Sequence, residues 1–197
     1  MLASYAAPGR NAWTEVPKWF AIHTRHQHEK VAAHTLACKG FEVFLPLYTT
    51  GRQWSDRTKE VSLPLFPNYL FLRGGMDRRL SILTTPGVHN LVAFAGVPAI
   101  IPDAEIDGVR QAIATRTRVN PHPFLKNGDW VRVKCGPLEG IEGILVRAQS
   151  HYRLVLSVEL LAKSVAVEVE TWAVERVPRV ERRELDRSLA AIYHPFV

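Results

Sequence analysis

The stretch that decides the fold is Gly128-Asp-Trp-Val-Arg-Val-Lys-Cys-Gly-Pro-Leu-Glu-Gly-Ile-Glu-Gly143. Val131 and Val133 alternate with Arg132 and Lys134, which is the period-two pattern of a strand that buries one face. The glycines that follow allow tight turns and positive φ angles that other residues avoid. The stretch therefore predicts one strand, a glycine-rich turn and the beginning of a second strand.

The alternation of apolar and polar residues continues towards the C-terminus. One alternating set is Leu154, Leu156, Val158 and Leu160, and a second is Val165, Val167 and Val169. Short strands separated by tight turns are typical of a small barrel. Several residues between 154 and 169 also tolerate a helix, but β-branched residues dominate the second set. The sequence therefore favours a five-stranded barrel over a helical hairpin in this region.

The N-terminal half alternates strands with helices. Strands are predicted at Trp19–His23, 41–45, 66–72 and 88–94, and helices at 25–39, from Asp77 and from Asp103. Gly40 occupies a C-cap position, and Asp77 and Asp103 are expected to cap their helices. The polar segment 46–64 predicts a basic hairpin that turns at Gly51. The predicted fold class is therefore α+β, with helices packed on an antiparallel sheet, followed by the barrel.

These patterns divide the chain into five segments. A loose leader is expected over 1–17, the α+β domain over 18–115, and a stiff linker with two prolines over 116–125. The barrel follows over 126–178 and a charged tail over 179–197. At 197 residues, the chain is long enough to form one or two domains with a core.

Composition narrows the class of partner and the compartment. Hydrophobic residues make up 47% of the chain, so it should fold, and the formal net charge of +6 favours nucleic acid as a partner. Two cysteines cannot build a disulfide framework. The sequence has no run of about 18 apolar residues and no secretory pattern at its start. We therefore expect a cytoplasmic protein that does not enter a membrane.

Enzyme and metal chemistry are not favoured. The sequence has no phosphate-binding loop, no Gly-x-Ser-x-Gly motif and no carboxylate pair that can be placed on one face. His23, His26, His28 and His34 lie close in sequence, but their spacing does not match a structural zinc site. We predict a non-enzymatic protein without a cofactor, and a bound metal is the less favoured alternative.

Two stretches resemble the NusG family of transcription factors. Leu63-Pro-Leu-Phe-Pro-Asn-Tyr-Leu-Phe-Leu72 looks like the third strand of the NusG N-terminal domain, and Gly128–Gly143 resembles the KOW motif. Residues 64–71 and 87–102 are similar to the specialised paralogue RfaH and to capsule-operon antiterminators. The resemblance, over about residues 18–178, implies a transcription elongation regulator that suppresses pausing or termination. A ribosome-associated or general RNA-binding KOW protein is the alternative.

The resemblance implies that an apolar hollow in the N-terminal domain binds the clamp helices of the largest catalytic RNA polymerase subunit. On this chain the hollow would consist of Phe66, Tyr69, Phe94, Ile106 and Val109. For Tyr69 and Val109, a role as ordinary core residues stays equally open. Phe66 and Phe94 each adjoin a loop or a strand end, which favours contact with a partner.

The resemblance also implies two contacts with DNA. The hairpin residues Arg52, Trp54, Arg57 and Lys59 would project towards DNA upstream of the polymerase. The residues that begin the first helix, Arg25, His26 and His28, would lie near an exposed non-template strand. A solvated basic loop is the alternative for the hairpin.

Two further pairs complete the implied contacts. Arg78 and Arg79 would lie near the opposing lobe of the polymerase. Leu160 and Leu161 would present an apolar patch on the barrel to a small-subunit ribosomal protein, and leucine at this place weakens the case for binding the Rho terminator. The alternative is that both leucines close the barrel. We expect the protein to act as a monomer.

Overall fold

The N-terminal sheet is antiparallel and five-stranded. The structure is a computed structural model, and it describes residues 17–53, 58–94, 96–115, 119–123, 128–148 and 151–177. The main strand order is β2-β5-β1-β6, and β9 pairs with β1. The strands are β1 (Trp19–Thr24), β2 (Glu42–Phe44), β5 (Tyr69–Arg73), β6 (Val88–Leu91) and β9 (Ile100–Ile101).

Strand β1 shows why this sheet forms two packed faces. Its residues alternate, so that Trp19 and Ala21 enter one core cluster while Phe20 and Ile22 enter the other. The second cluster is covered by α1 (Glu29–Cys38) and α2 (Arg79–Leu83), which follows the short 3₁₀ turn η1 (Met76–Arg78). The first cluster includes residues of α3 (Asp103–Ala114). The predicted α+β class is confirmed.

The first helix is shorter than the sequence pattern predicts. It begins at Glu29 rather than Arg25, because Gln27 has a φ of 62° and so cannot belong to a right-handed helix. Its end agrees with the prediction. Lys39 is the C-cap, and Gly40 follows with a φ of 80°, the left-handed conformation that glycine adopts without strain.

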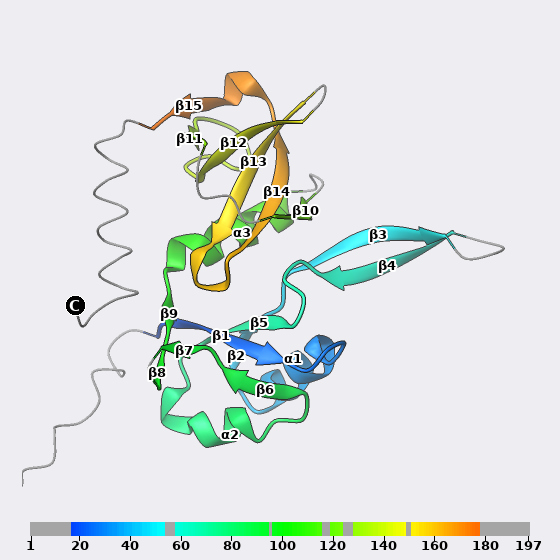
Figure 1. Cartoon of the computed structure of the whole chain (residues 1–197), viewed down its shortest axis with the longest axis vertical. Helices are drawn as coiled ribbons and strands as arrows, with labels where there is room; N and C mark the ends of the chain where they lie inside the picture. Colours follow the sequence, from blue (N-terminus) through cyan, green and yellow to red (C-terminus); the bar gives the residue numbers. More distant parts are fainter. Residues whose placement is uncertain are drawn as a thin grey trace, which may run out of the picture.

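The basic hairpin forms, but its turn is not at Gly51. Strands β3 (Leu47–Gln53) and β4 (Thr58–Pro64) pair only with each other among the described strands, and Gly51 lies within β3 opposite Glu60. The predicted turn is therefore wrong, because the register places the reversal between Gln53 and Thr58. Figure 1 shows this hairpin extending away from both domains.

Two helix caps and one strand also differ from the prediction. Neither Asp77 nor Asp103 is the N-cap of its helix; those positions belong to Arg78 and to Pro102, without a side-chain cap. The predicted strand 88–94 is divided: β6 ends at Leu91, and the N–H of Val92 still donates to Ala21 O of β1 at 2.9 Å. Beyond the break, β7 (Ala93–Phe94) pairs with β8 (Val97–Pro98) as a small separate hairpin.

The C-terminal sheet contains the predicted five strands and one more. Its order is β10-β14-β13-β12-β11-β15. The predicted five are β11 (Asp129–Val133), β12 (Glu142–Ala148), β13 (His151–Val158), β14 (Lys163–Val169) and β15 (Val174–Arg176). The 3₁₀ turns η2 (Glu159–Leu161) and η3 (Thr171–Ala173) flank β14. The extra strand, β10 (Val119–His122), lies within the segment that the sequence predicted to be a linker.

The two domains are packed against each other, with α3 in contact with both. One core cluster joins Trp19, Phe66 and Phe71 of the N-terminal domain to barrel residues such as Val131 and Leu156. Figure 1 shows the barrel seated beside α3, above the N-terminal sheet. We call this packing the closed arrangement. No helix in the described part of the chain has the length and apolar character needed to span a membrane.

Candidate functional site

Three of the five residues predicted for the hollow meet in the closed arrangement. Phe66 follows the hairpin, and Ile106 and Val109 lie on α3; all three are fully buried in the cluster that also contains the barrel core. Tyr69, at the start of β5, is half-buried and packs against the same cluster. The Nζ atom of Lys163 on the barrel lies 6.0 Å from the Tyr69 ring centroid. The barrel therefore lies over this part of the N-terminal domain.

Hydrogen bonds fix the turn that carries Phe66 and Tyr69. Asn68 has a φ of 68°, and its N–H donates to Oε1 of the buried Glu29 at 2.9 Å. Its carbonyl oxygen accepts the N–H of Thr24 at 2.8 Å. Asparagine tolerates this left-handed conformation better than most residues. The turn is thus attached to both β1 and α1, and the Phe66 ring packs edge-on against Phe71 at 5.5 Å.

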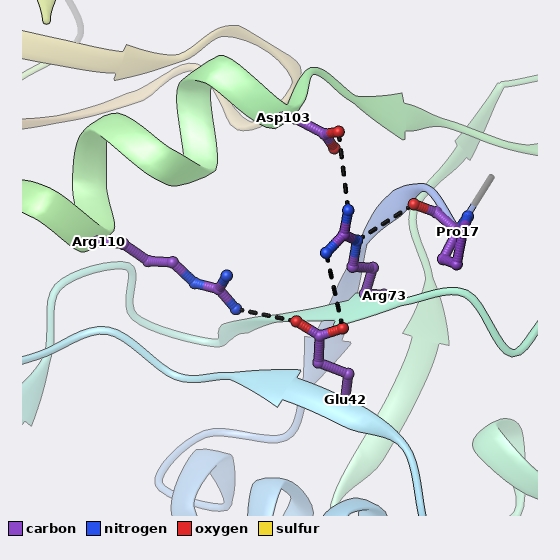
Figure 2. A network of polar contacts seen from close by, with 5 residues as sticks. All are labelled: Pro17, Glu42, Arg73, Asp103 and Arg110. Atoms are coloured by element: carbon purple, nitrogen blue, oxygen red, sulfur yellow. Dashed lines mark hydrogen bonds and ion pairs between the residues drawn. The ribbon is translucent and has the colours of Figure 1, made fainter.

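A polar network attaches α3 to the edge of the N-terminal sheet (Figure 2). Arg110 on α3 lies 3.3 Å from a carboxylate oxygen of Glu42, and its guanidinium carbon is 4.5 Å from the Trp19 ring centroid. Arg73 lies 3.9 Å from Glu42 and 3.9 Å from Asp103 at the start of α3. Guanidinium groups therefore lie above the ring of the fully buried Trp19. Ion pairs and stacking attach α3 to the N-terminal domain.

The other side of α3 contacts the barrel at the glycine-rich turn between β11 and β12. The Nε2 atom of Gln111 donates to Pro137 O at 2.8 Å. An ideal Cβ on Gly108 would lie 3.8 Å from Cγ2 of Ile141, which shows how closely the barrel approaches the helix. This contact is less charged than the contact of α3 with the sheet, but α3 also packs closely on β13 through the shared apolar cluster.

The leucines predicted to contact a partner also face the closed core. Leu160 and Leu161 form the end of η2 and pack as half-buried residues against the cluster that contains Phe66. The closed arrangement therefore partly buries the predicted partner surface of the barrel together with the predicted hollow.

Phe94 is not part of this cluster. It lies on β7, is 53% exposed and stands opposite Val97, which is 42% exposed. The family resemblance placed Phe94 in the hollow, but Phe94 lies on the separate β7–β8 hairpin.

The predicted DNA-contacting residues occupy two places. Arg52 and Lys59 are directly opposite each other in the β3–β4 ladder, and the Lys59 side chain is exposed. Trp54 and Arg57 lie outside the described residues. Arg25, His26 and His28 are exposed in the loop before α1. His28 Nδ1 donates to His26 O at 2.8 Å, so part of this loop is held in place.

Arg78 has a structural role in the N-terminal domain. It donates to Lys39 O at 3.1 Å and its guanidinium carbon lies 4.1 Å from the Phe41 ring centroid. Arg79 is exposed at the start of α2. Both arginines of the predicted lobe contact are therefore exposed, and Arg78 also contacts the protein itself.

A row of rings beside the hollow was not anticipated. The His23 ring lies 5.1 Å from that of Tyr69 and 5.2 Å from that of His89, on three neighbouring strands. His89 lies on β6, next to the buried Val88, and its exposed side chain had no signal in the sequence. Among the described residues, no three His, Cys, Asp or Glu side chains are placed to hold a metal ion.

Comparisons with known proteins agree with this architecture. Residues 17–110 match the family model described as transcription termination factor nusG. The chain is 24% identical over 174 residues to the transcription termination/antitermination protein NusG of Halalkalibacterium halodurans, covering 81% of this chain and 98% of that protein. NusG of Helicobacter pylori strain J99 is 24% identical over 125 residues, covering 62% of this chain and 71% of that protein.

A solved structure shares the fold across both domains. It is described as domain interaction in Thermotoga maritima NusG, and it aligns with a TM-score of 0.52 at 17% identity. The alignment covers 82% of this chain and 98% of that one. The family consists of non-enzymatic transcription factors. Over residues 17–110 the chain matches the NusG family, and over 81% of its length it is similar to a NusG protein.

Proposed function

We propose that this protein is an RfaH-like transcription elongation regulator that binds the clamp helices of RNA polymerase and suppresses pausing or termination. The observation that carries the proposal is the convergence of Phe66, Tyr69, Ile106 and Val109 from one turn and one helix on a single apolar site. Buried aromatic and aliphatic side chains at such a site are the anchors of a protein interface. The cytoplasm is the compartment in which this function would operate.

The closed arrangement implies that the barrel has to leave before the polymerase can bind. Phe66, Ile106 and Val109 are each 0% exposed while the barrel is seated, so a partner has no access to them. The same movement would uncover Leu160 and Leu161, through which the barrel would recruit a further factor such as a small-subunit ribosomal protein. Both proposed surfaces would thus become available together.

The mechanism requires no chemistry on the factor. A protein that binds the clamp together with the opposing lobe stabilises the polymerase state in which the two are held near each other. The exposed side chains proposed for the lobe are Arg78 and Arg79. Because a paused polymerase needs the alternative state, binding lowers the population of paused complexes.

The β3–β4 hairpin is proposed to bind DNA upstream of the polymerase. Arg52 and Lys59 lie opposite each other in the register of the hairpin, and the exposed Lys59 is one of its proposed phosphate contacts. Phosphate contacts from these residues, with Arg57 and Trp54, would be independent of sequence and weakened by salt. Arg25, His26 and His28 are the proposed contacts with the non-template strand.

The test is binding of a purified clamp-helix fragment to the full chain. Gly108→Arg is the informative variant, since an arginine has no room between α3 and Ile141 and should displace the barrel. We expect saturable binding that is tighter for Gly108→Arg than for the wild type. Adding Tyr69→Ala to Gly108→Arg should weaken it at least tenfold.

Two single substitutions complete the design in the Gly108→Arg background. Leu80→Ala removes a 74% exposed side chain on α2 and is the matched control, which should bind normally. Phe94→Ala decides whether the β7–β8 hairpin belongs to the interface. A folded Gly108→Arg protein that does not bind the fragment would refute the polymerase proposal and leave the RNA-binding alternative.

A further inference from the structure

The strand β10 connects the domains and also extends the barrel sheet. It pairs antiparallel with β14, with Val119 opposite Val167, Asn120 opposite Ala166 and His122 opposite Ser164. In Figure 1 it lies at the edge of the barrel beside β14. A chain segment between two domains is therefore attached along one edge of the second domain.

This attachment buries little side-chain surface and lacks one backbone donor. Val119 is the one buried side chain of β10, whereas Asn120 and Pro121 are exposed. Pro121 has no N–H, so it cannot donate to the ladder at its position opposite Val165. Proline is confined to edge strands for this reason. The partner strand β14 is anchored independently, because it pairs along its whole length with β13.

Pairing of β10 limits how far the barrel can move from α3. Five residue steps separate Ala114, the end of α3, from Val119, and an extended chain of that length spans at most about 18 Å. A helix with its side chains is about 10–12 Å across, so a pair of helices lying side by side needs about 20 Å or more. Ala114 and Asp129 are fifteen residue steps apart, and an extended chain of that length spans about 50 Å.

We propose that β10 is a detachable strap: it separates from β14 when the barrel leaves α3, and the lengthened connection makes room for the partner at the hollow. The inference rests on the proposed function insofar as the partner is the pair of clamp helices. The strap itself is a property of this chain and is testable without the polymerase. In the attached state the β10 edge of the barrel stays within about 18 Å of the end of α3.

A disulfide across the strap tests this proposal. In a Cys38→Ser/Cys135→Ser background, Asn120→Cys/Ala166→Cys places two cysteines directly opposite each other in the β10–β14 register. Directly opposed residues have Cα and Cβ separations that a disulfide can bridge. Arg147→Cys/Tyr152→Cys is the matched control, since this pair is equally opposed in β12–β13 and attaches nothing to the connection.

The polymerase-independent readout is small-angle scattering of both cysteine pairs in the Gly108→Arg background. We expect the reduced strap variant to have a larger maximum dimension than the oxidised one, by up to about 30 Å, the difference between the two chain lengths. The control pair should give the same dimension in both redox states. Equal dimensions for the oxidised and reduced strap variant would overturn the proposal.

Binding of the clamp-helix fragment then links the strap to function. The oxidised strap variant should bind at least tenfold more weakly than its reduced form, with the control unchanged. If no variant binds the fragment, the proposed function fails while the scattering result still decides the strap.

Val119→Ser provides a second test without a disulfide, because it weakens the strap and should speed amide exchange in residues 163–169. Unchanged exchange in that variant would count against detachment.

Discussion

Replacing Arg110 by alanine should destabilise the N-terminal domain mainly by removing stacking, and only slightly by removing charge. The guanidinium carbon of Arg110 lies 4.5 Å from the Trp19 ring centroid and 5.0 Å from that of Phe44. The same group lies 3.3 Å from Glu42 (Figure 2). The substitution therefore removes two kinds of interaction whose sizes can be separated.

The expected loss is about 1–2 kcal/mol of unfolding free energy. Each cation–π contact at a partly exposed site is worth about 0.5–1 kcal/mol. The ion pair adds little, because the side chains of Arg110 and Glu42 are 37% and 50% exposed and solvent screens them. Alanine is a slightly better helix former than arginine, which offsets a few tenths of a kcal/mol. For a chain of this length, the loss corresponds to a lowering of Tm by about 2–8 °C.

The assay is thermal and urea unfolding, followed by circular dichroism at low salt and at 0.5 M salt, roughly five times the ionic strength at which the Debye length is about 10 Å. We expect the loss in Arg110→Ala to persist at high salt, and Glu42→Gln to cost less than about 0.5 kcal/mol. Arg110→Met, which retains an apolar stem over Trp19, should recover part of the stability. If the loss in Arg110→Ala disappeared at high salt, or if Glu42→Gln reproduced it, the stacking argument would be wrong.

Three other substitutions test separate parts of the structure. Gly108→Ala should raise stability by about 0.5–1 kcal/mol in thermal unfolding, since a helical glycine is costly and the added Cβ meets only an ordinary contact. Gly143→Ala should destabilise the barrel by at least about 2 kcal/mol, because its Cβ would lie 2.6 Å from Val155 O; urea unfolding of the barrel strands measures this. Lys59→Ala should reduce the salt dependence of DNA binding by about one unit of slope, measured by titration from low to moderate salt.

The local elements of the fold were largely predictable from sequence. Period-two alternation identified the strands that became β11 and β13, because a strand with one buried face has to alternate. Gly40 marked the end of α1 because few other residues adopt its conformation. The positions that failed share a physical cause: Gln27 takes a left-handed conformation that propensity does not favour, and Gly51 lies in a strand that glycine usually interrupts. Gly51 is held in its strand by the ladder with β4, which its own preference does not predict.

Strand β10 could not have been predicted from its own residues. Val119-Asn-Pro-His122 has the composition of a linker, and it is ordered into a strand only because β14 offers an unpaired edge. Pairing of this kind depends on the partner strand and not on the segment. The same reasoning explains why the polar network around Arg110 was missed: Glu42, Arg73 and Asp103 are distant in sequence and meet only when α3 crosses the sheet.

The residues of the hollow could be interpreted from sequence either as core residues or as interface residues, and the two roles do not exclude each other. An apolar side chain such as Val109 fits either a core or an interface, and sequence has no means of separating them. In the closed arrangement Val109 and Ile106 are core residues in every physical sense, since each is 0% exposed and packed in a continuous cluster. Part of that cluster, however, belongs to the barrel, a second domain that meets α3 through apolar packing and the hydrogen bond of Gln111. Burial of these residues therefore depends on the position of a second domain, and the same side chains become interface residues when that domain moves.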